Sequence, residues 1–276
     1  MLNDFAVFIL THGRPNNIVT LASLKKCGYT GKIYFIVDNE DKTINTYINK
    51  YGKDNVKVFD KKKEADQVDE GNNFDERRTI THARNACFNI AKEIGIKYFI
   101  QLDDDYSSFL FRFKDLYAGK IKNINTVFEA FLNFYKSTNI KSIAFSQGGD
   151  HIGGFNITEM KRKCMNSFFC STDRPFKFIG AMNEDVNTYT TLGNRGDLFF
   201  TFTSIQLCQK ATQSQNSGIT DMYLRYGTYC KAFTTTMMHP SGVKVSIMNS
   251  NHARIHHSIK WNNTVPMIIE EKYKKI

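Results

Sequence analysis

The sequence predicts an α/β fold with a doubly wound sheet, and three observations lead to this prediction. Short continuous apolar runs, typical of strands buried on both faces, recur along residues 1–105. Segments with helical spacing alternate with these runs, as in βαβ units. Polar residues follow the ends of three of the runs, and this is the edge at which sheets of this type bind ligands.

In the first half of the chain, each expected element follows from a local pattern. The first strand, 5–10, is entirely apolar and ends in the loop 11–15. The last helix carries small and apolar residues on one face and stops at Gly95. Residues 60–74 are polar without clear periodicity, so we expect a surface loop there. The other expected strands are 32–37, 56–59 and 97–102, and the expected helices are 17–27, 43–51 and 75–94.

The second half of the chain is expected to be richer in β-structure. Residues 124–137 have the spacing of a helix, and the glycine-rich stretch 148–154 is typical of a loop. Neither a linker composition nor an internal repeat divides the chain. We therefore expect a single domain over 1–276, with an α/β half over 1–105 and a β-richer half over 106–276. The expected strands of the second half are 142–146, 176–179, 198–205 and 232–237.

The net positive charge indicates which classes of molecule the protein is expected to bind. The 276 residues include 37 Lys and Arg against 27 Asp and Glu, a formal net charge of +10. Such a surface attracts nucleic acid, anionic membranes or phosphorylated small molecules. No apolar run is long enough to span a bilayer, and the N-terminus lacks the pattern of a signal peptide. The six cysteines form no C-x-x-C pair, so we expect reduced thiols in a cytoplasmic protein.

Three consecutive aspartates, Asp103, Asp104 and Asp105, directly follow the expected strand 97–102. Carboxylates at positions i and i+2 can both reach one divalent ion, and such hard oxygen ligands suit Mg²⁺ or Mn²⁺. Diphosphate oxygens of a bound nucleotide can complete the coordination shell. The alternative is an acidic turn that caps the next segment.

Two other strand ends and one helix offer further polar groups. The first strand end carries Thr11 and Arg14 without a G-x-G-x-x-G or P-loop pattern, so neither a dinucleotide-binding fold nor a P-loop is supported. Arg14 can pair with a phosphate. Asp38, after the second strand, can accept a hydrogen bond from a base N–H or a ribose hydroxyl. Arg84 and Asn85 can reach a sugar or a diphosphate. The alternative for the strand-end residues is that they only form turns. The alternative for Arg84 and Asn85 is that they lie on a helix face exposed to solvent.

An acidic pair lies in the second half of the chain, at Glu184 and Asp185, directly after Asn183. A carboxylate beside a donor sugar can take the proton of an attacking hydroxyl. The alternative is that Asn183 or Asp185 caps the start of a short helix, and the two interpretations are compatible.

Histidines gather near the end of the chain at His252, His256 and His257. An imidazole there can supply a third protein ligand to the metal. The H-x-x-x-H spacing lacks the companions of a zinc site, and a phosphate contact on a basic loop is the alternative.

These motifs, in this order, resemble a GT-A glycosyltransferase over nearly the whole chain: residues 11–14, Asp38, residues 83–85, residues 102–105 and residues 183–185. More narrowly, the chain is similar to phage relatives of the kinetoplastid base J glucosyltransferase, which glycosylate hydroxymethyl-pyrimidines in DNA. The segments that carry this closer similarity are 180–185, 196–197, 212–213, 227–229, 240–245, 254–257, 261–262 and Pro266.

The resemblance implies a GT-A (Rossmann-like) mixed sheet, a UDP-sugar donor and a Mn²⁺ or Mg²⁺ cofactor. It implies that Asp103 and Asp105 are the D-x-D contacts to the metal and the ribose. Because Asp104 lies between them in a run of three aspartates, the register of the D-x-D motif stays open. Asp38 becomes a uracil or ribose contact. Glu184 or Asp185 becomes the base, with Asp185 the first choice, and His256 or His257 becomes the late metal ligand. The implied reaction is an inverting hexosyl or pentosyl transfer in the host cytoplasm.

The implied acceptor is DNA that contains 5-hydroxymethyl-pyrimidines, with hydroxymethylcytosine and hydroxymethyluracil both open. Three other functions compete with this one. A GT-A enzyme acting on polysaccharide or protein would show no retention on DNA. A non-catalytic nucleic-acid-binding relative would lack the metal carboxylates, yet Asp103 and Asp105 are present. A nucleotidyltransferase usually needs a glycine-rich phosphate loop, for which residues 11–15 are a poor match.

Overall fold

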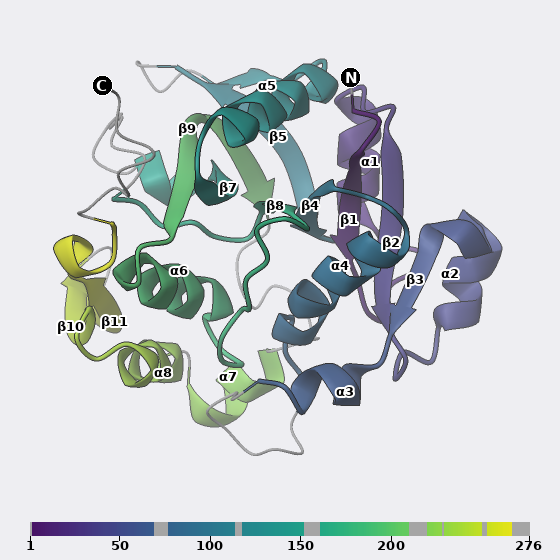
Figure 1. Ribbon diagram of the computed structural model, residues 1–276. Helices are drawn as coiled ribbons and strands as arrows, with labels where there is room; N and C mark the ends of the chain where they lie inside the picture. The colour runs from purple at the N-terminus through teal and green to yellow at the C-terminus, as the bar shows by residue number, and fades with distance from the viewer. Residues whose placement is uncertain are drawn as a thin grey trace.

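The computed structural model describes residues 2–68, 77–113, 118–151, 161–209, 220–227, 229–249 and 253–266 (Figure 1). The strands are β1 (Phe5–Leu10), β2 (Lys32–Asp38), β3 (Val56–Phe59), β4 (Tyr98–Asp103), β5 (Tyr106–Arg112), β6 (Ala118–Lys120), β7 (Ile140–Ser146), β8 (Phe168–Ser171), β9 (Leu198–Gln209), β10 (Val243–Asn249) and β11 (Ala253–Ile259). The α-helices are α1 (Val19–Lys26), α2 (Ile44–Tyr51), α3 (Lys61–Ala65), α4 (Thr81–Glu93), α5 (Ile124–Ser137), α6 (Glu184–Asn194), α7 (Thr220–Tyr226) and α8 (Cys230–Met238).

A mixed sheet runs through both halves of the chain. Among the described residues its strand order is β3-β2-β1-β4-β8-β7-β9-β5-β6. The strands β1 to β4 are parallel to one another, whereas β8 is antiparallel to both β4 and β7. The strand β9 pairs parallel with β7 and antiparallel with β5. This arrangement confirms the predicted α/β class with a mixed sheet and a β-richer second half.

Two apolar cores cover the two faces of this sheet. Successive residues of β1 belong alternately to one core and to the other. Phe5, Val7 and Ile9 pack into the core that includes buried residues of α1, α2 and α5. Ala6, Phe8 and Leu10 pack into the core that includes buried residues of α4 and α6. The strand is buried on both faces, and this explains why its sequence is apolar without interruption.

A two-stranded antiparallel ribbon, β10–β11, lies beside the sheet and packs against α8 (Figure 1). The sequence had predicted a strand over 232–237, and this prediction is wrong because α8 covers these residues. The threonine run there is β-prone, but the hydroxyls of Thr234, Thr235 and Thr236 each donate to the carbonyl four residues earlier, which suits a helix. The helix also gains contacts with α6 and with both ribbon strands.

Other boundaries differ from the expectations in smaller ways. The predicted strand 176–179 is wrong, because these residues belong to no strand or helix. The expected loop 60–74 contains the short helix α3, and residues 69–74 lie outside the described residues. The expected helix 75–94 begins only at Thr81. The expected helix 124–137 and the strands β1 to β4 are confirmed.

The helices and the cysteines of the structure each allow one further statement. In the described part of the chain, no helix combines the length and the apolar character that crossing a bilayer requires. All six cysteines are present as free thiols, and Cys27, Cys87, Cys164 and Cys170 are buried.

Candidate active site

The carboxyl ends of β1, β2 and β4 meet at one edge of the sheet. Leu10, the last residue of β1, pairs with Ile36 on one side and with Asp103 on the other. The residues that follow these strands therefore lie together, as the sequence predicted. Thr11, Asp38 and Asp103 are the first polar groups at this edge.

The carboxylate of Asp104 holds the loop after β1 against the end of β4. Its two oxygens accept hydrogen bonds from the Thr11 hydroxyl (2.7 Å) and from the Arg14 guanidinium (3.0 Å). The Tyr47 hydroxyl joins the same loop by contacting Thr11 Oγ1 at 2.9 Å and accepting from the Arg14 backbone N–H at 2.8 Å. Asp104 therefore holds the loop after β1 in place.

Asp38 lies in a charged cluster at the end of β2. Its carboxylate contacts His12 Nδ1 at 2.6 Å and Lys61 Nζ at 3.5 Å, and it accepts from the Glu40 N–H at 3.1 Å. Burial raises the pKa of Asp38, but the hydrogen bond to His12 and the charge of Lys61 outweigh burial, so the pKa is lowered. The hydrogen bond to Asp38 also raises the pKa of His12. Asp38 is thus held as a carboxylate, able to accept hydrogen bonds.

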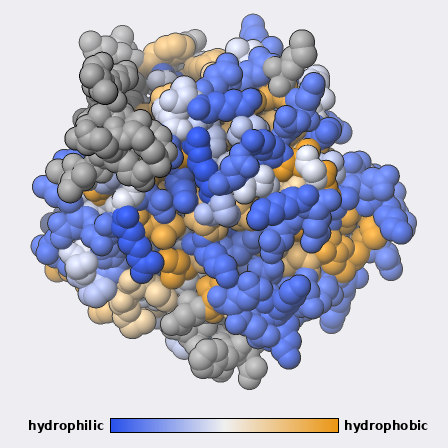
Figure 2. All heavy atoms as spheres, viewed as in Figure 1, coloured by the Kyte–Doolittle hydropathy of each residue, from blue (hydrophilic) through white to orange (hydrophobic). Residues whose placement is uncertain are grey.

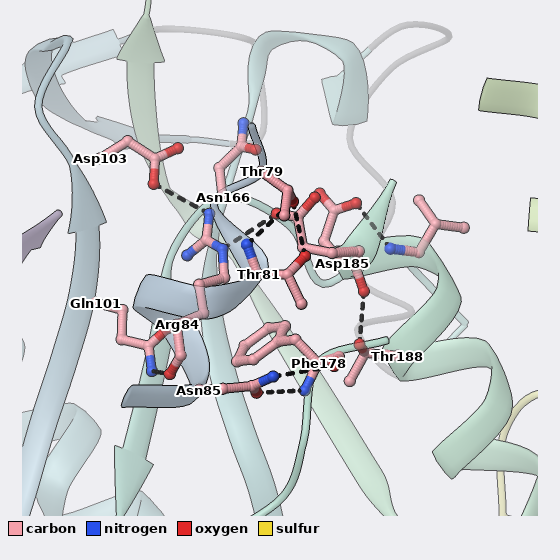
Figure 3. A network of polar contacts seen from close by, with 12 residues as sticks. Thr79, Thr81, Arg84, Asn85, Gln101, Asp103, Asn166, Phe178, Asp185 and Thr188 are labelled. Atoms are coloured by element: carbon pink, nitrogen blue, oxygen red, sulfur yellow. Dashed lines mark hydrogen bonds and ion pairs between the residues drawn. The ribbon is translucent and has the colours of Figure 1, made fainter. Parts of the chain in front are cut away.

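Arg84, on α4, lies between two carboxylates that are far apart in sequence (Figure 3). Its Nη2 donates to Asp103 Oδ1 at 3.0 Å, and its Nε donates to Glu184 Oε1 at 3.1 Å. The side chain is only 1% exposed, and the guanidinium stacks on the rings of Phe168 and Phe178 at 5.0 and 5.6 Å. A fully desolvated cation therefore connects the first half of the site to the second.

Hydrogen bonds between α4 and the segment before α6 secure this connection. The hydroxyl of Thr79 donates to the Ala181 carbonyl at 2.9 Å, and that of Thr81 donates to the Gly180 carbonyl at 2.6 Å. Asn85, which we expected to contact the donor, instead exchanges two hydrogen bonds with the backbone of Phe178. Asn85 is buried, so these bonds place it in the support of the site rather than at its surface.

The acidic pair Glu184 and Asp185 lies in the first turn of α6, which confirms the predicted helix start at this point. Asn183 precedes the pair in the left-handed conformation (φ 53°) that asparagine tolerates, and this turns the chain sharply into the helix. Asp185 Oδ1 accepts from the Val186 N–H at 2.7 Å. Negative charge at this end of a helix is favoured by the helix dipole.

Burial and like charge act together on the carboxylates of the site. Burial raises the pKa of Glu184 to about 7, with the charge of Asp185 adding to the shift and that of Arg84 opposing it. Burial likewise raises the pKa of Asp185. Burial, followed by the charges of Asp103 and Asp104, raises the pKa of Asp105 to about 6. Carboxylates crowded in this way are typical of sites that handle protons or bind cations.

The residues at the end of β4 fit a divalent cation. Asp103 and Asp105 would offer hard oxygen ligands, and a cation would relieve the repulsion that adds to burial in raising the pKa of Asp105. In the described part of the chain, no three His, Cys, Asp or Glu side chains lie close enough together to hold a metal ion. Two protein carboxylates with oxygens from a bound diphosphate are sufficient for Mg²⁺ or Mn²⁺.

The predicted histidine ligands lie elsewhere. His256 and His257 are on β11, and the structure does not bring either one together with Asp103 and Asp105. Burial, together with the charges of Lys163 and Lys231, lowers the pKa of His256 to about 4 and that of His257 to about 3. A positively charged environment of this kind opposes a metal cation and favours an anion. His252 lies outside the described residues.

Sequence reasoning missed several residues of the site. His12 and Lys61, which contact Asp38, were not among the expected site residues, although His12 lies inside the motif 11–14 and Lys61 in a basic run. Lys163 and Lys231 are close enough to Asp185 for its charge to raise their pKa against the larger lowering by burial. Lys163 belongs to the short basic cluster 161–163, which was the only sequence signal for it.

The buried bridge yields a first prediction about stability. Replacing Arg84 with Gln removes a fully buried cation from Asp103 and Glu184, whose side chains are 24% and 13% exposed, and this should lower the free energy of unfolding by about 3–5 kcal/mol. Urea denaturation would measure this loss. Lys141→Gln, which breaks a more exposed pair with Asp197 (3.4 Å), should cost no more than about 1 kcal/mol. Equal losses of unfolding free energy in the two variants would contradict the prediction that the Arg84 bridge stabilises the fold more than the exposed pair does.

Several solved structures share similarity with the chain. Staphylococcus aureus TarS is 13% identical with a TM-score of 0.43, over 83% of this chain and 39% of that one. The chain thus spans well under half of that TarS chain. Glucosyl-3-phosphoglycerate synthase from Mycobacterium tuberculosis, solved with Mg²⁺ and UDP, is 10% identical with a TM-score of 0.45, over 92% of this chain and 87% of that one. No curated protein matches the chain.

A family model matches most of the chain. It is described as TAGT, TET-Associated Glycosyltransferase, and it covers residues 5–218. The matched region contains β1, β2 and β4 with their polar ends, Arg84, and the acidic pair of α6. The predicted glycosyltransferase activity is therefore confirmed at the level of the family, and this chain belongs to the TET-associated glycosyltransferase family.

Proposed function

We propose that this glycosyltransferase moves a sugar from a UDP-sugar to the hydroxymethyl group of a modified pyrimidine in DNA. One observation carries the proposal. In a chain of the TET-associated family, Arg84 joins the carboxylate of Asp103, at the end of β4, to the acidic pair of α6. Groups suited to a nucleotide diphosphate and groups suited to an attacking hydroxyl thus border one another.

The donor side of the proposed site consists of the strand ends. Asp38 is kept ionised by His12 and Lys61, so it can accept hydrogen bonds from the uracil or the ribose. Arg14 is held at the rim by Asp104 and is part-exposed, which leaves it next to an incoming phosphate. A divalent cation held by Asp103 and Asp105 would, when bound, offset the charge of the leaving diphosphate.

The acceptor side consists of the first turn of α6. Asp185 takes the proton of the acceptor hydroxyl while the hydroxyl oxygen bonds to the anomeric carbon of the sugar. The bond from that carbon to the diphosphate oxygen breaks in the same step, so the configuration inverts. Glu184 is committed to Arg84 and orients the pair. The raised pKa of Asp185 makes it a stronger base than an exposed aspartate.

The net charge of +10 and the family description support DNA as the acceptor. The direct test is to incubate the protein with Mn²⁺, a panel of UDP-sugars and DNA containing 5-hydroxymethyl-pyrimidines, and to identify modified nucleosides by mass spectrometry. We expect a mass gain of one sugar on the hydroxymethylated base and none on unmodified DNA. Transfer to a glycan or protein acceptor with none to DNA would refute the acceptor assignment.

DNA affinity should depend steeply on salt. Lysine and arginine contacts to phosphates release condensed counterions, so a few such contacts should weaken binding by about 10-fold or more between roughly 50 and 200 mM salt. Fluorescence anisotropy with a labelled duplex measures this slope. Binding that stays constant over that range would show that the basic surface does not contact DNA phosphates.

A further inference from the structure

Basic side chains from three segments that are far apart in sequence gather beside the acidic pair, and we call them the cationic cluster. The reaction proposed above assigns no role to any of them. The members are Lys163 in the segment before β8, Lys231 on α8, and Arg254, His256 and His257 on β11.

The helix α8 directs Lys231 toward the start of α6. Asn183, which precedes the acidic pair, donates to the Lys231 carbonyl at 3.2 Å and to Thr235 Oγ1 at 3.0 Å. Lys231 lies one helical turn before Thr235, so both are on the side of α8 that faces α6. The opposite side carries the exposed Phe233 and Met237, and Figure 2 shows apolar atoms at the surface over α8. The lysine therefore points away from the apolar side of its helix and toward the site.

The strand β11 brings the other members to the same place, because it packs against α8. Arg254 and His256 are two residues apart and share one face of this strand. Burial lowers the pKa of His256, and the charges of both lysines and of Arg254 lower it further. The rings of His256 and His257 have centroids 4.3 Å apart. Both imidazoles therefore lie among the cations.

Lys163 reaches the cluster from the segment between η2 (Gly148–His151) and β8. Its carbonyl accepts from the Thr201 hydroxyl at 2.8 Å, and the next residue, Cys164, packs in the same core as Val186 of α6. Burial lowers the pKa of both lysines, and the charge of Asp185 opposes this effect in each. The proposed base is thus the carboxylate that both lysines share as a neighbour.

The members of the cluster lack partners of opposite charge. Among the residues that the structure describes, neither lysine nor Arg254 forms an ion pair. His257 is only 7% exposed, and neither of its ring nitrogens has a hydrogen-bond partner. One of these nitrogens carries a hydrogen in the neutral ring, and a buried N–H without an acceptor is costly. Cations and an unused donor side by side are suited to an anion with several oxygens.

We propose that the cationic cluster binds a phosphate of the acceptor DNA, at the target nucleotide or at its neighbour, and so holds the target base beside Asp185. This rests on the proposed function for its acceptor. The cluster lies on the acceptor side, because Asp185 acts on both lysines and the histidines are not brought together with Asp103 and Asp105. Three cations beside one aspartate leave a positive charge for one phosphodiester.

The test neutralises the phosphates of the DNA one at a time. The probes are labelled duplexes with one 5-hydroxymethylcytosine, or one 5-hydroxymethyluracil, in which a single phosphate near that base is replaced by an uncharged methylphosphonate. Fluorescence anisotropy without a sugar donor measures binding. For the wild-type protein, one position should weaken binding by about 10-fold or more, the typical worth of a hydrogen bond to a charged group.

The variants Lys163→Met and Lys231→Met keep the apolar stem and remove the charge. Each should bind the intact duplex about 10-fold or more weakly, and neither should lose affinity again when the same phosphate is neutralised, because both changes remove one contact. The slope of log affinity against log salt should also become shallower by about 0.9. Lys163→Met removes a cation without an ion pair, so urea denaturation should show no loss of stability.

A matched control is Lys26→Met, which removes an exposed lysine at the last residue of α1 and should bind every duplex as the wild type does. Losses that simply add in the lysine variants at every position would overturn the proposal. Slower transfer with unchanged DNA binding would equally overturn it, since the lysines would then act only on Asp185.

A titration with UDP and Mn²⁺ distinguishes the two sources of phosphate. UDP affinity should be the same in Lys231→Met as in the wild type. Weaker UDP binding with unchanged DNA binding would assign the cluster to the diphosphate of the donor and refute the proposal.

The transfer assay separates this proposal from the proposed function. If hydroxymethylated DNA is glycosylated but no single phosphate depends on Lys163 or Lys231, the phosphate site fails and the function stands. If no DNA is glycosylated but one phosphate still depends on these lysines, the phosphate site stands and the acceptor assignment fails.

Discussion

Asp185→Asn is expected to lower sugar transfer by about 10²–10⁴-fold while leaving the fold and donor binding intact. The carboxylate is the proposed proton acceptor, and loss of a general base typically costs this much. Asparagine has the same shape, and its side-chain oxygen can still accept the bond from the Val186 N–H that starts α6. Single-turnover transfer to hydroxymethylated DNA measures the chemical step, and calorimetric titration with UDP measures donor binding.

Glu184→Gln distinguishes the two members of the acidic pair. Because Glu184 is bonded to Arg84 and Asp185 is not, we expect Glu184→Gln to lower transfer less than Asp185→Asn does. Asp173→Asn, which alters an exposed pair with Lys97, is the control and should transfer at the wild-type rate. A dead Glu184→Gln with an active Asp185→Asn would exchange the two roles. Activity in both would mean that another group is the base or that configuration is retained.

Asp105→Asn is expected to abolish metal-stimulated nucleotide binding and to lower transfer by about 100-fold or more. Neutralising the leaving diphosphate is worth several kcal/mol, and the substitution removes one of two anionic ligands. In the described part of the chain, no other side chain bonds to the Asp105 carboxylate. The substitution also relieves repulsion from Asp103 and Asp104, so the protein should be no less stable.

The measurement for Asp105 is a UDP titration with and without Mn²⁺, together with thermal unfolding. Wild-type protein should bind UDP more tightly with Mn²⁺, and the variant should show no such difference. The unfolding temperature of the variant should not fall. Full transfer activity in Asp105→Asn, or in wild-type protein treated with EDTA, would exclude the metal-dependent assignment for these carboxylates.

The sequence by itself determined the first part of the fold and the gathering of polar residues at the strand ends. Strands β1 to β4 are short apolar runs. A continuous apolar run is typical of a strand that is buried on both faces, so these strands can be predicted from local sequence. Because parallel strands end at a common edge, the polar residues after them, Thr11, Asp38 and Asp103, could be placed together without knowledge of the other contacts.

Only the tertiary structure decided how the second half completes the site. Arg84 and Glu184 are separated by 100 residues, and no local pattern encodes their contact. The same holds for Asn85, whose bonds to Phe178 replaced the expected ligand contact. Such pairings depend on which elements the long-range packing brings together.

The histidines and α8 are two further cases in which tertiary packing, and not local sequence, decided the outcome. His256 and His257 stood out in the sequence as candidate ligands, yet the ribbon places them among lysines and away from Asp103 and Asp105. The threonine-rich segment of α8 was predicted as a strand from its intrinsic preference, and packing against α6 and the ribbon made it a helix. Local preference differs by about 1 kcal/mol between helix and strand, and contacts made far along the chain exceed that difference.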